Sequence, residues 1–329
     1  MKRVFLFFIT ILFLITSEAQ QDAQLSMYMF NLLHFNPAYA GYHKSFNATA
    51  IYRHQWDNVN GAPRTISLTA HNKTKNENYN WGVAFKGDKM GLWEIGSLDG
   101  IFCYKIRLKK ENSISLAASA GVSFIQFKSE NSKMPIPENI QLGNQNKFAP
   151  NFGAGIFITG PKYFFGFSVP HIILTNYNST NNGFSGGQTK DTFASQFNHL
   201  FAQGGLMFNI SEDVKLRPSF MFKYVTNSPP SIDVNMSVLL KYRFWVGMTY
   251  RLGGNIYNDN GERIFGEGNA IVGMVKFLCT QQIEIGYAYD YSLSKLVTLN
   301  RGTHELMFNF IAFKTKKVRF ITPRYVKYF

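Results

Sequence analysis

The stretch Ile283-Glu284-Ile285-Gly286-Tyr287-Ala288-Tyr289-Asp290-Tyr291 decides the fold. Successive side chains of a strand point to opposite faces, so isoleucines and tyrosines fill one face and small or acidic residues the other. The same alternation returns over 303–312, where His304, Leu306, Phe308, Phe310 and Ala312 oppose Thr303, Glu305, Met307 and Asn309. In a soluble sandwich the polar face would meet water. In a transmembrane barrel the apolar face meets lipid and the polar face lines the lumen.

Composition favours the barrel. The chain is 45% hydrophobic and 16% aromatic, while only 16% of its residues are charged, against about 25% in an average protein. Beyond residue 20 there is no apolar run of about 18 residues, which argues against membrane-spanning helices. An excess of aromatic residues with few charges is typical of the two aromatic girdles of a membrane barrel.

The alternation predicts an all-β, transmembrane antiparallel β-barrel of about 14 strands over residues 45–313. The expected strands are 46–56, 66–70, 79–85, 98–108, 114–124, 149–159, 162–169, 198–210, 213–225, 231–240, 244–253, 268–277, 281–290 and 301–313.

The connections between these strands alternate in length. Those after even strands are tight, as at 160–161 and 241–243. Those after odd strands are long, roughly 86–97, 128–147, 170–197, 253–267 and 291–300. Short periplasmic turns and long extracellular loops are the pattern of outer-membrane barrels. An even strand count then predicts that both chain ends lie in the periplasm.

The two ends of the chain differ from the barrel. Residues 1–19 have the basic start, the apolar run and the small-residue cleavage site of a secretory signal peptide. Residues 20–44 do not alternate, and we expect a periplasmic leader or plug segment there. Residues 314–329 form a basic and aromatic tail, which we expect in the periplasm.

The polar strand faces predict what fills the lumen. Arg53, Arg251 and Glu305 lie on small or polar faces, where lumenal hydrogen-bond networks pin a barrel closed. Bulky Gln55, Met221 and Lys223 share such faces. We therefore expect a filled or plugged lumen, with residues 20–41 as the candidate occupant. The alternative is a general or substrate-specific diffusion porin, which needs an open aqueous lumen.

No motif indicates catalysis, a cofactor or a metal. Ser185 lies in a G-x-S-x-G match that lacks the strand before it and the helix after it. Asn258 and Asn260 imitate only part of a calcium loop. Cys103 and Cys279 could form a disulfide, but two unpaired, buried or lipid-facing cysteines fit their apolar segments better. The net charge of +14 is scattered over turns without a nucleic-acid-binding motif, so no nucleic-acid partner is expected.

Partner binding is predicted at the two ends of the chain. Basic side chains interleaved with aromatic anchors suit an acidic periplasmic protein. The candidate residues are Lys314, Lys316, Lys317, Arg319, Phe320, Pro323, Arg324, Tyr325 and Phe329 in the tail, and Asn36, Pro37 and Tyr39 in the leader. The alternative for the tail is a segment that folds back and seals the periplasmic mouth.

Several stretches resemble the PorP/SprF family in the family's own order. They are 21–30, Asn36-Pro37-Ala38-Tyr39-Ala40-Gly41, 52–56 with 61–65, 167–171, 216–220, 244–247, 286–294, 302–305 and Pro323-Arg324-Tyr325. Ala23 and Leu33 replace residues that are usually proline, and the 253–267 loop is longer than typical.

This resemblance implies a non-enzymatic outer-membrane component of the type IX secretion and gliding-motility apparatus of Bacteroidota. It also implies the partners: outer-membrane lipid, periplasmic lipoproteins or peptidoglycan-binding proteins, and a secreted adhesin as a further candidate.

Overall fold

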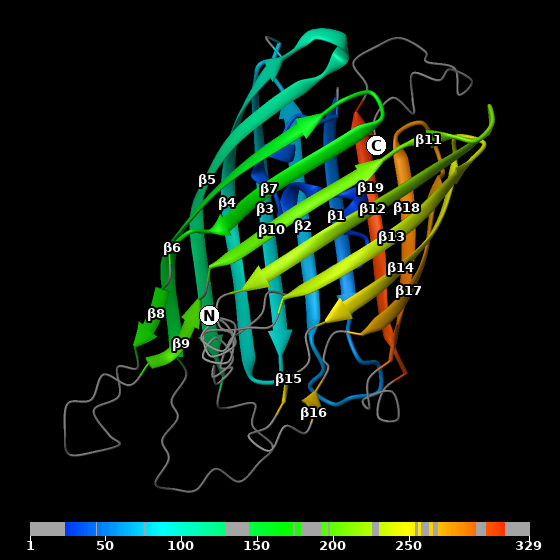
Figure 1. The fold of residues 1–329 in the computed structure, drawn as a ribbon. Coiled ribbons are helices and arrows are strands. Elements are labelled where there is room, and N and C mark those ends of the chain that lie inside the picture. Colours follow the sequence, from blue (N-terminus) through cyan, green and yellow to red (C-terminus); the bar gives the residue numbers. More distant parts are fainter. Residues whose placement is uncertain are drawn as a thin grey trace, which may run out of the picture.

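A computed structural model of the chain describes residues 24–43, 45–75, 77–128, 145–173, 175–178, 192–196, 198–225, 230–253, 256–257, 263–265, 269–293 and 301–312. Fourteen of its strands close into one antiparallel barrel (Figure 1). Each strand pairs with its neighbour in sequence, and the first strand pairs with the last, Phe46 opposite Ala312 through His54 opposite His304.

The barrel strands agree with the fourteen expected from the sequence. They are β1 (Phe46–His54), β2 (Arg64–Lys73), β3 (Tyr79–Met90), β4 (Trp93–Arg107), β5 (Ser113–Phe127), β6 (Gln145–Thr159), β7 (Tyr163–His171), β10 (His199–Leu206), β12 (Val214–Val225), β13 (Ser231–Leu240), β14 (Phe244–Gly253), β17 (Ala270–Leu278), β18 (Ile283–Ser292) and β19 (Thr303–Ala312).

Short elements complete the described part. They are β11 (Phe208–Asn209), which pairs with β12, the hairpins β8 (Thr175–Asn178) with β9 (Thr192–Gln196) and β15 (Ile256–Tyr257) with β16 (Arg263–Phe265), and the 3-10 helices η1 (Tyr28–Phe30), η2 (Leu32–His34), η3 (Pro37–Tyr39) and η4 (Lys109–Glu111).

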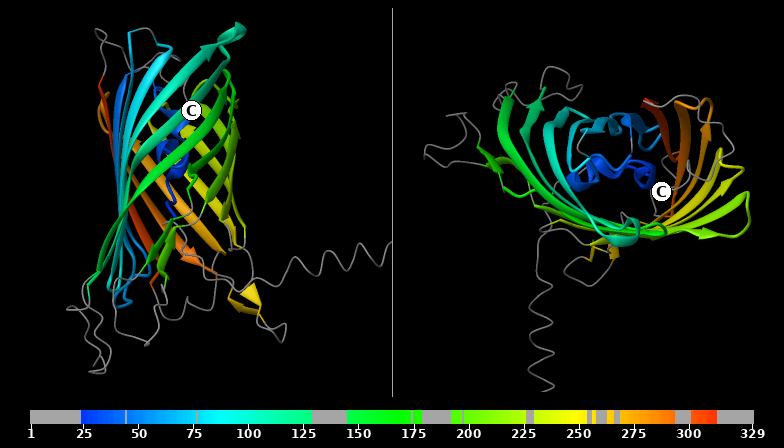
Figure 2. Two further views of the ribbon diagram at one scale, coloured as in Figure 1. Left: turned by 90° about the vertical axis from the view of Figure 1, so that its left-hand side faces the viewer. Right: turned by 90° about the horizontal axis from the view of Figure 1, so that it is seen from above.

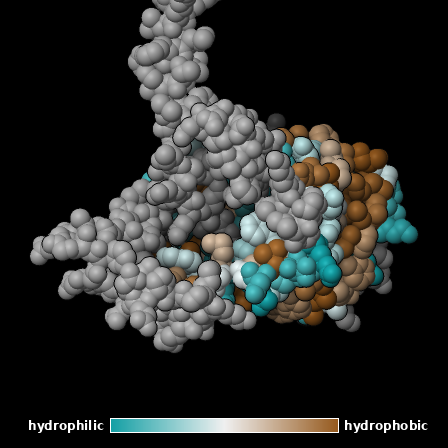
Figure 3. Space-filling model, turned by 90° about the horizontal axis from the view of Figure 1, so that it is seen from below, coloured by the Kyte–Doolittle hydropathy of each residue, from teal (hydrophilic) through white to brown (hydrophobic). Residues whose placement is uncertain are grey.

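The strand faces divide as the alternation predicted. In β17 every second residue is buried and the others are exposed. The outward residues are large and apolar, such as Phe102, Leu306 and Phe308 at 57%, 55% and 47% exposure. Figure 3 shows apolar side chains along the outer wall. Such a wall needs lipid around it. None of the helices in the described residues is long and apolar enough to cross a membrane.

The two ends of the barrel differ, as expected. Short turns at 74–78, 108–112, 160–162, 241–243 and 279–282 gather at one end, the upper end in Figure 1. The strand ends that lead into the longer connections lie at the other end, together with both small hairpins. The short-turn end is therefore the periplasmic mouth and the long-loop end the extracellular one.

The prediction of a long loop at 86–97 is wrong. β3 and β4 stay paired as far as Met90 opposite Trp93, so that only Gly91 and Leu92 form the turn. Gly91 has a φ of 58°, which glycine adopts without steric cost. This hairpin carries polar residues such as Asp88 and Glu94. A strand that extends beyond the lipid layer keeps its backbone hydrogen bonds to the neighbouring strand without needing an apolar face. The sequence of this hairpin therefore resembles that of a loop.

Residues 24–43 lie inside the barrel (Figure 2, right). The segment is a chain of three one-turn helices, and its own asparagines cap η2 and η3. The Asn31 side chain accepts from the Leu33 amide, and that of Asn36 from the Ala38 amide. Pro37 begins η3 at a position where its missing N–H costs nothing. Side-chain capping satisfies the backbone locally, so the segment needs no strand partner.

We expect Phe102→Arg to destabilise the barrel by about 2–4 kcal/mol, because a charge near the middle of a lipid-facing strand must leave water. Phe102→Leu should cost far less. Denaturant unfolding of both variants from lipid vesicles measures the difference. Equal costs for Arg and Leu would contradict the assignment of this face to lipid.

Candidate functional site

A cluster of buried charges holds the first described residues to the barrel wall; we call it the lumen latch. Its members are Ser26 of the inner segment, Arg53 of β1, Lys223 of β12, Asp233 of β13, Arg251 of β14, Asp290 of β18 and Glu305 of β19. Three cations face three carboxylates, so the latch is neutral as a whole. This matters because an unpaired charge away from water is costly.

Glu305 is at the centre of the latch. Its two carboxylate oxygens accept from the amides of Ser26 and Met27, both at 2.7 Å. Arg53 donates to the same carboxylate at 3.1 Å and to Asp290 at 2.8 Å. One carboxylate thus binds the inner segment and the neighbouring strand together.

The latch continues around the lumen through Asp290. Arg251 donates to Asp290 at 3.2 Å and to Asp233 at 3.1 Å. Lys223 donates to Asp233 at 2.8 Å. The Ser26 hydroxyl donates to Asp290 at 2.7 Å. The expectation that Arg53, Arg251 and Glu305 take part in lumenal hydrogen-bond networks is therefore confirmed, and the structure joins all three in one network.

The latch lies toward the extracellular end, because its residues are close to the strand ends that lead into long connections. The inner segment starts there at Gln24 and leaves at the periplasmic mouth, where β1 begins with Phe46. The leader was expected on the periplasmic side or in the lumen. Its described part occupies the lumen and extends away from the periplasm.

A second contact holds the segment nearer the periplasmic mouth; we call it the cation clamp. Phe30 packs edge-on against Trp245 of β14, with ring centroids 5.8 Å apart. The Arg217 guanidinium lies 4.9 Å from the Phe30 ring and 4.3 Å from the Trp245 ring. The Lys276 ammonium lies 4.5 Å from Phe30. Cation–π contacts gain strength when they are shielded from water.

The Asn36-to-Gly41 turn packs against the opposite wall. Asn36 donates to the Ile156 carbonyl at 3.0 Å. A Cβ on Gly155 would lie 2.2 Å from the Asn36 side-chain oxygen, so only glycine allows this approach. Tyr39 is 3% exposed, and burial raises the pKa of its hydroxyl well above the ordinary value.

Asn36, Pro37 and Tyr39 were expected to contact a partner. The structure places all three in the barrel interior, where strand residues surround them. In this structure their buried side chains offer a partner no surface, and the contacts of Asn36 hold the segment to the wall. The nine candidate residues of 314–329 lie outside the described residues, as do Ser185, Asn258 and Asn260.

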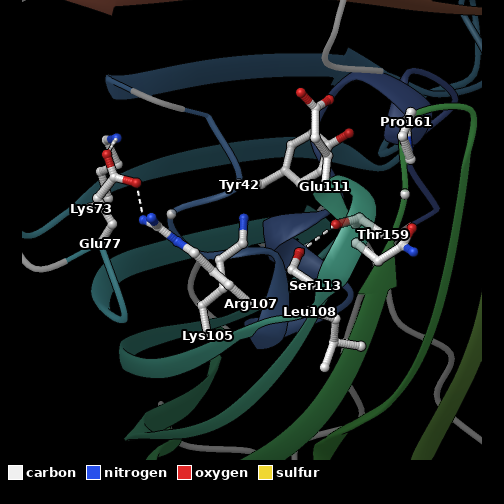
Figure 4. Close-up of a pocket in the computed structure, with 13 residues that line it drawn as sticks. Tyr42, Lys73, Glu77, Lys105, Arg107, Leu108, Glu111, Ser113, Thr159 and Pro161 are labelled. Carbon is white, nitrogen blue, oxygen red and sulfur yellow. Dashed lines mark hydrogen bonds and ion pairs between the residues drawn. The ribbon is translucent and has the colours of Figure 1, made fainter.

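A pocket opens at the periplasmic mouth beside the point where the inner segment leaves the barrel (Figure 4). Its volume is about 270 Å³. The walls come from the ends of β2, β4, β5 and β6 and their turns, with Tyr42 of the inner segment. Lys105 and Arg107 extend from β4, and Arg107 bonds Glu77. Ser113 and Thr159 share a hydrogen bond of 2.7 Å.

Other polar and thiol groups of the described residues lie outside the latch, the clamp and the pocket. His171 and His199, which are separate in sequence, meet across β7 and β10 with ring centroids 5.3 Å apart. Within the described ranges, no group of three or more His, Cys, Asp and Glu side chains could hold a metal ion. Cys103 is buried and Cys279 is exposed, and both are free. The interpretation as two unpaired cysteines is therefore confirmed.

The sequence reasoning missed four residues of this interior. Asp290 and Asp233 of the latch could have been found, because both occupy the inward-facing positions of their strands. Ser26 and Phe30 could not, because a segment without periodicity does not indicate which wall it contacts.

A family comparison identifies this architecture. Residues 17–310 match the family described as type IX secretion system membrane protein PorP/SprF. The chain belongs to the PorP/SprF family. It is an outer-membrane β-barrel of the type IX secretion system. A search of the curated proteins found no match.

Solved structures similar to this PorP/SprF protein include outer membrane protein Omp33 of Acinetobacter baumannii, with 10% identity over 83% of this chain and 100% of that chain, TM-score 0.46. The toluene transporter TbuX of Ralstonia pickettii has 8% identity over 87% and 93%, TM-score 0.49. The monoaromatic hydrocarbon channel CymD has 9% identity over 88% and 94%, TM-score 0.48.

We expect Glu305→Gln to lower the free energy of unfolding by about 3 kcal/mol or more, because it leaves Arg53 buried with one carboxylate fewer. Glu94→Gln is the matched control. Glu94 bonds two cations, Lys89 and Lys128, where Glu305 bonds one, but the Glu94 side chain is 25% exposed against 0% for Glu305. That change should cost under about 1 kcal/mol. Equal losses in unfolding measurements would mean that the latch does not stabilise the barrel.

Proposed function

We propose that this PorP/SprF protein is a closed, non-enzymatic barrel that serves the secretion and gliding machinery as a scaffold rather than as a diffusion pore. The observation that carries the proposal is the inner segment. Residues 24–43 run the length of the lumen and bury Leu25, Met27, Leu33 and Tyr39 against the strands. A porin needs an open aqueous lumen, whereas here residues 24–43 of the chain itself occupy the lumen.

The contacts of the inner segment argue against an open diffusion pore. Removing the segment would expose the lumen latch to water and leave Arg217 without the Phe30 ring. Both contacts would have to break together, because the segment is bound near each end of the lumen. A diffusion porin, the alternative, would gain nothing from an interior built to hold its own chain.

We further propose that the barrel docks periplasmic lipoproteins or peptidoglycan-binding proteins of the machine, with a secreted adhesin as a further candidate partner. Membership of the family supports an assembly with other secretion components. The tail Lys314–Phe329 suits such docking by composition, since its arginines and tyrosines are residue types that dominate binding energies.

We expect the purified protein to give little steady conductance in a planar bilayer, since the lumen is filled. Deleting residues 24–43 should produce open channels. If the deletion does not fold, Glu305→Gln with Asp290→Asn should raise the frequency of opening, because both changes weaken the latch. Steady, high conductance from the intact protein would overturn the scaffold proposal in favour of the porin.

We expect deletion of residues 314–329 to abolish the recovery of periplasmic partners on pull-down while the barrel still inserts, since the strands end at Ala312. Replacing the tail's lysines with glutamines but keeping its aromatic residues separates the role of charge from that of packing. Docking by the tail fails if the truncated barrel keeps its partners and supports secretion. Such a result would favour a tail that only seals the mouth.

A further inference from the structure

We infer that the pocket at the periplasmic mouth is a recognition site for an acidic side chain on a segment of a periplasmic partner. This inference rests on the proposed docking function and gives it a location in the described part of the chain. The site is distinct from the tail, and its residues come from β2, β4, β5, β6 and the exit of the inner segment.

The charge of the pocket favours an anion. Lys73, Lys105 and Arg107 line it with only Glu77 and Glu111 as carboxylates. Glu77 is shared, because both Lys73 and Arg107 pair with it. Three cations and two carboxylates leave the lining with one net positive charge, which attracts an incoming carboxylate.

The rim around the pocket is also positively charged. On the barrel quarter that holds the pocket, the cations include Lys73, Lys75, Lys105, Arg107, Lys109 and Lys162. The described carboxylates of this quarter are Glu77 and Glu111. Clustered charge of one sign steers an oppositely charged partner toward the mouth and raises the association rate.

The pocket faces the barrel axis and not the lipid. Lys105 and Arg107 continue the inward-facing series of Ile101 and Cys103 along β4. The alternate residues Phe102, Tyr104 and Ile106 are exposed on the outer wall. A lipid headgroup would approach from that outer wall. A protein segment reaching the open mouth approaches the pocket directly, which favours a peptide as the occupant.

The size and lining of the pocket indicate which kind of side chain it binds. At about 270 Å³ the pocket falls just below the roughly 300–1,000 Å³ of small-molecule sites. It suits one acidic side chain with part of a neighbour. Leu108 and Pro161 provide an apolar edge, and Leu108 is 48% exposed. The favoured motif is therefore an Asp or Glu beside an apolar residue.

The floor of the pocket links it to the inner segment. Gly41 and Tyr42 line it, and the Gly41 amide donates to the His71 ring at 3.1 Å. A Cβ on Gly41 would lie 2.2 Å from the Asn80 side chain, and its φ is 73°. The last turn of the segment is thus tightly packed, so a bound partner would meet a preformed surface.

The test uses the full-length barrel in detergent and a fluorescent peptide of alternating Glu and Leu, with a Gln–Leu peptide as the ligand control. Lys105→Gln with Arg107→Gln should weaken binding of the Glu–Leu peptide about tenfold or more. Lys241→Gln with Arg243→Gln removes the same charge from the turn between β13 and β14, across the barrel. That control should change binding less than about twofold.

Several outcomes would overturn the inference. One is an equal loss in both double variants, which would mean general attraction to the rim. Equal binding of the two peptides is another. A third is full displacement of the peptide by phosphatidylglycerol vesicles, with loss of vesicle binding in the pocket variant, which would assign the site to lipid.

A second measurement does not depend on variants folding. A benzophenone-labelled Glu–Leu peptide should cross-link within residues 105–113 of the unmodified protein, and adducts at 241–243 alone would contradict the site.

Heat-dependent gel mobility and unchanged bilayer conductance show that the double variants are folded. If peptide binding fails while conductance stays low, the pocket is wrong and the closed scaffold stands. High conductance with intact peptide binding would mean the reverse, because the pocket would then be supported and the closed scaffold refuted.

Discussion

The ion pair between Arg53 and Glu305 is the contact on which the structure depends most. The two residues are direct neighbours across the seam where β1 meets β19. The seam closes the barrel, and closure removes the last unpaired strand edges, which lipid cannot satisfy. The same carboxylate accepts the amides of Ser26 and Met27. Barrel closure and occupation of the lumen are therefore joined at one side chain.

This arrangement explains why buried charges persist in the interior. A well-packed apolar cluster could be as stable as a buried ion pair. An apolar cluster would not, however, direct a short segment without regular structure to one place. Ion pairs and hydrogen bonds to named backbone amides specify position, and the cation clamp at Arg217 repeats the principle nearer the periplasmic mouth. The segment is held by specific partners at both ends of its path.

Much of the fold was predictable from the sequence, because lipid imposes a simple rule. Outward residues such as Tyr287 and Phe308 must be apolar, inward ones such as Ala288 and Glu305 need not be, and the period of two is visible in a single chain. The rule fails where the lipid ends. The β3–β4 hairpin extends beyond it, and its polar sequence at 86–97 resembled a loop for that reason.

The interior was predictable in kind but not in detail. Arg53, Arg251 and Glu305 could be assigned to lumenal hydrogen-bond networks because each is a charge on an inward face. Their partner Ser26 could not, since its contacts join residues 264 and 279 positions apart in the chain. The pocket at the mouth also depends on four separate strand ends that only the closed barrel brings together. Long-range contacts of single residues leave no periodic signal.

The most direct test of the occupied lumen uses the native thiol of Cys103, which lies 3.7 Å from the Ala38 carbonyl. In a Cys279→Ser background, Ala38→Cys introduces a second thiol on the inner segment. Mild oxidation of the folded protein in outer-membrane vesicles, followed by peptide mapping, should reveal a disulfide between position 38 and Cys103, since both lie within reach of each other. Denatured protein provides the unlinked reference. Two thiols that stay free and react rapidly with a maleimide in the folded barrel would contradict the account.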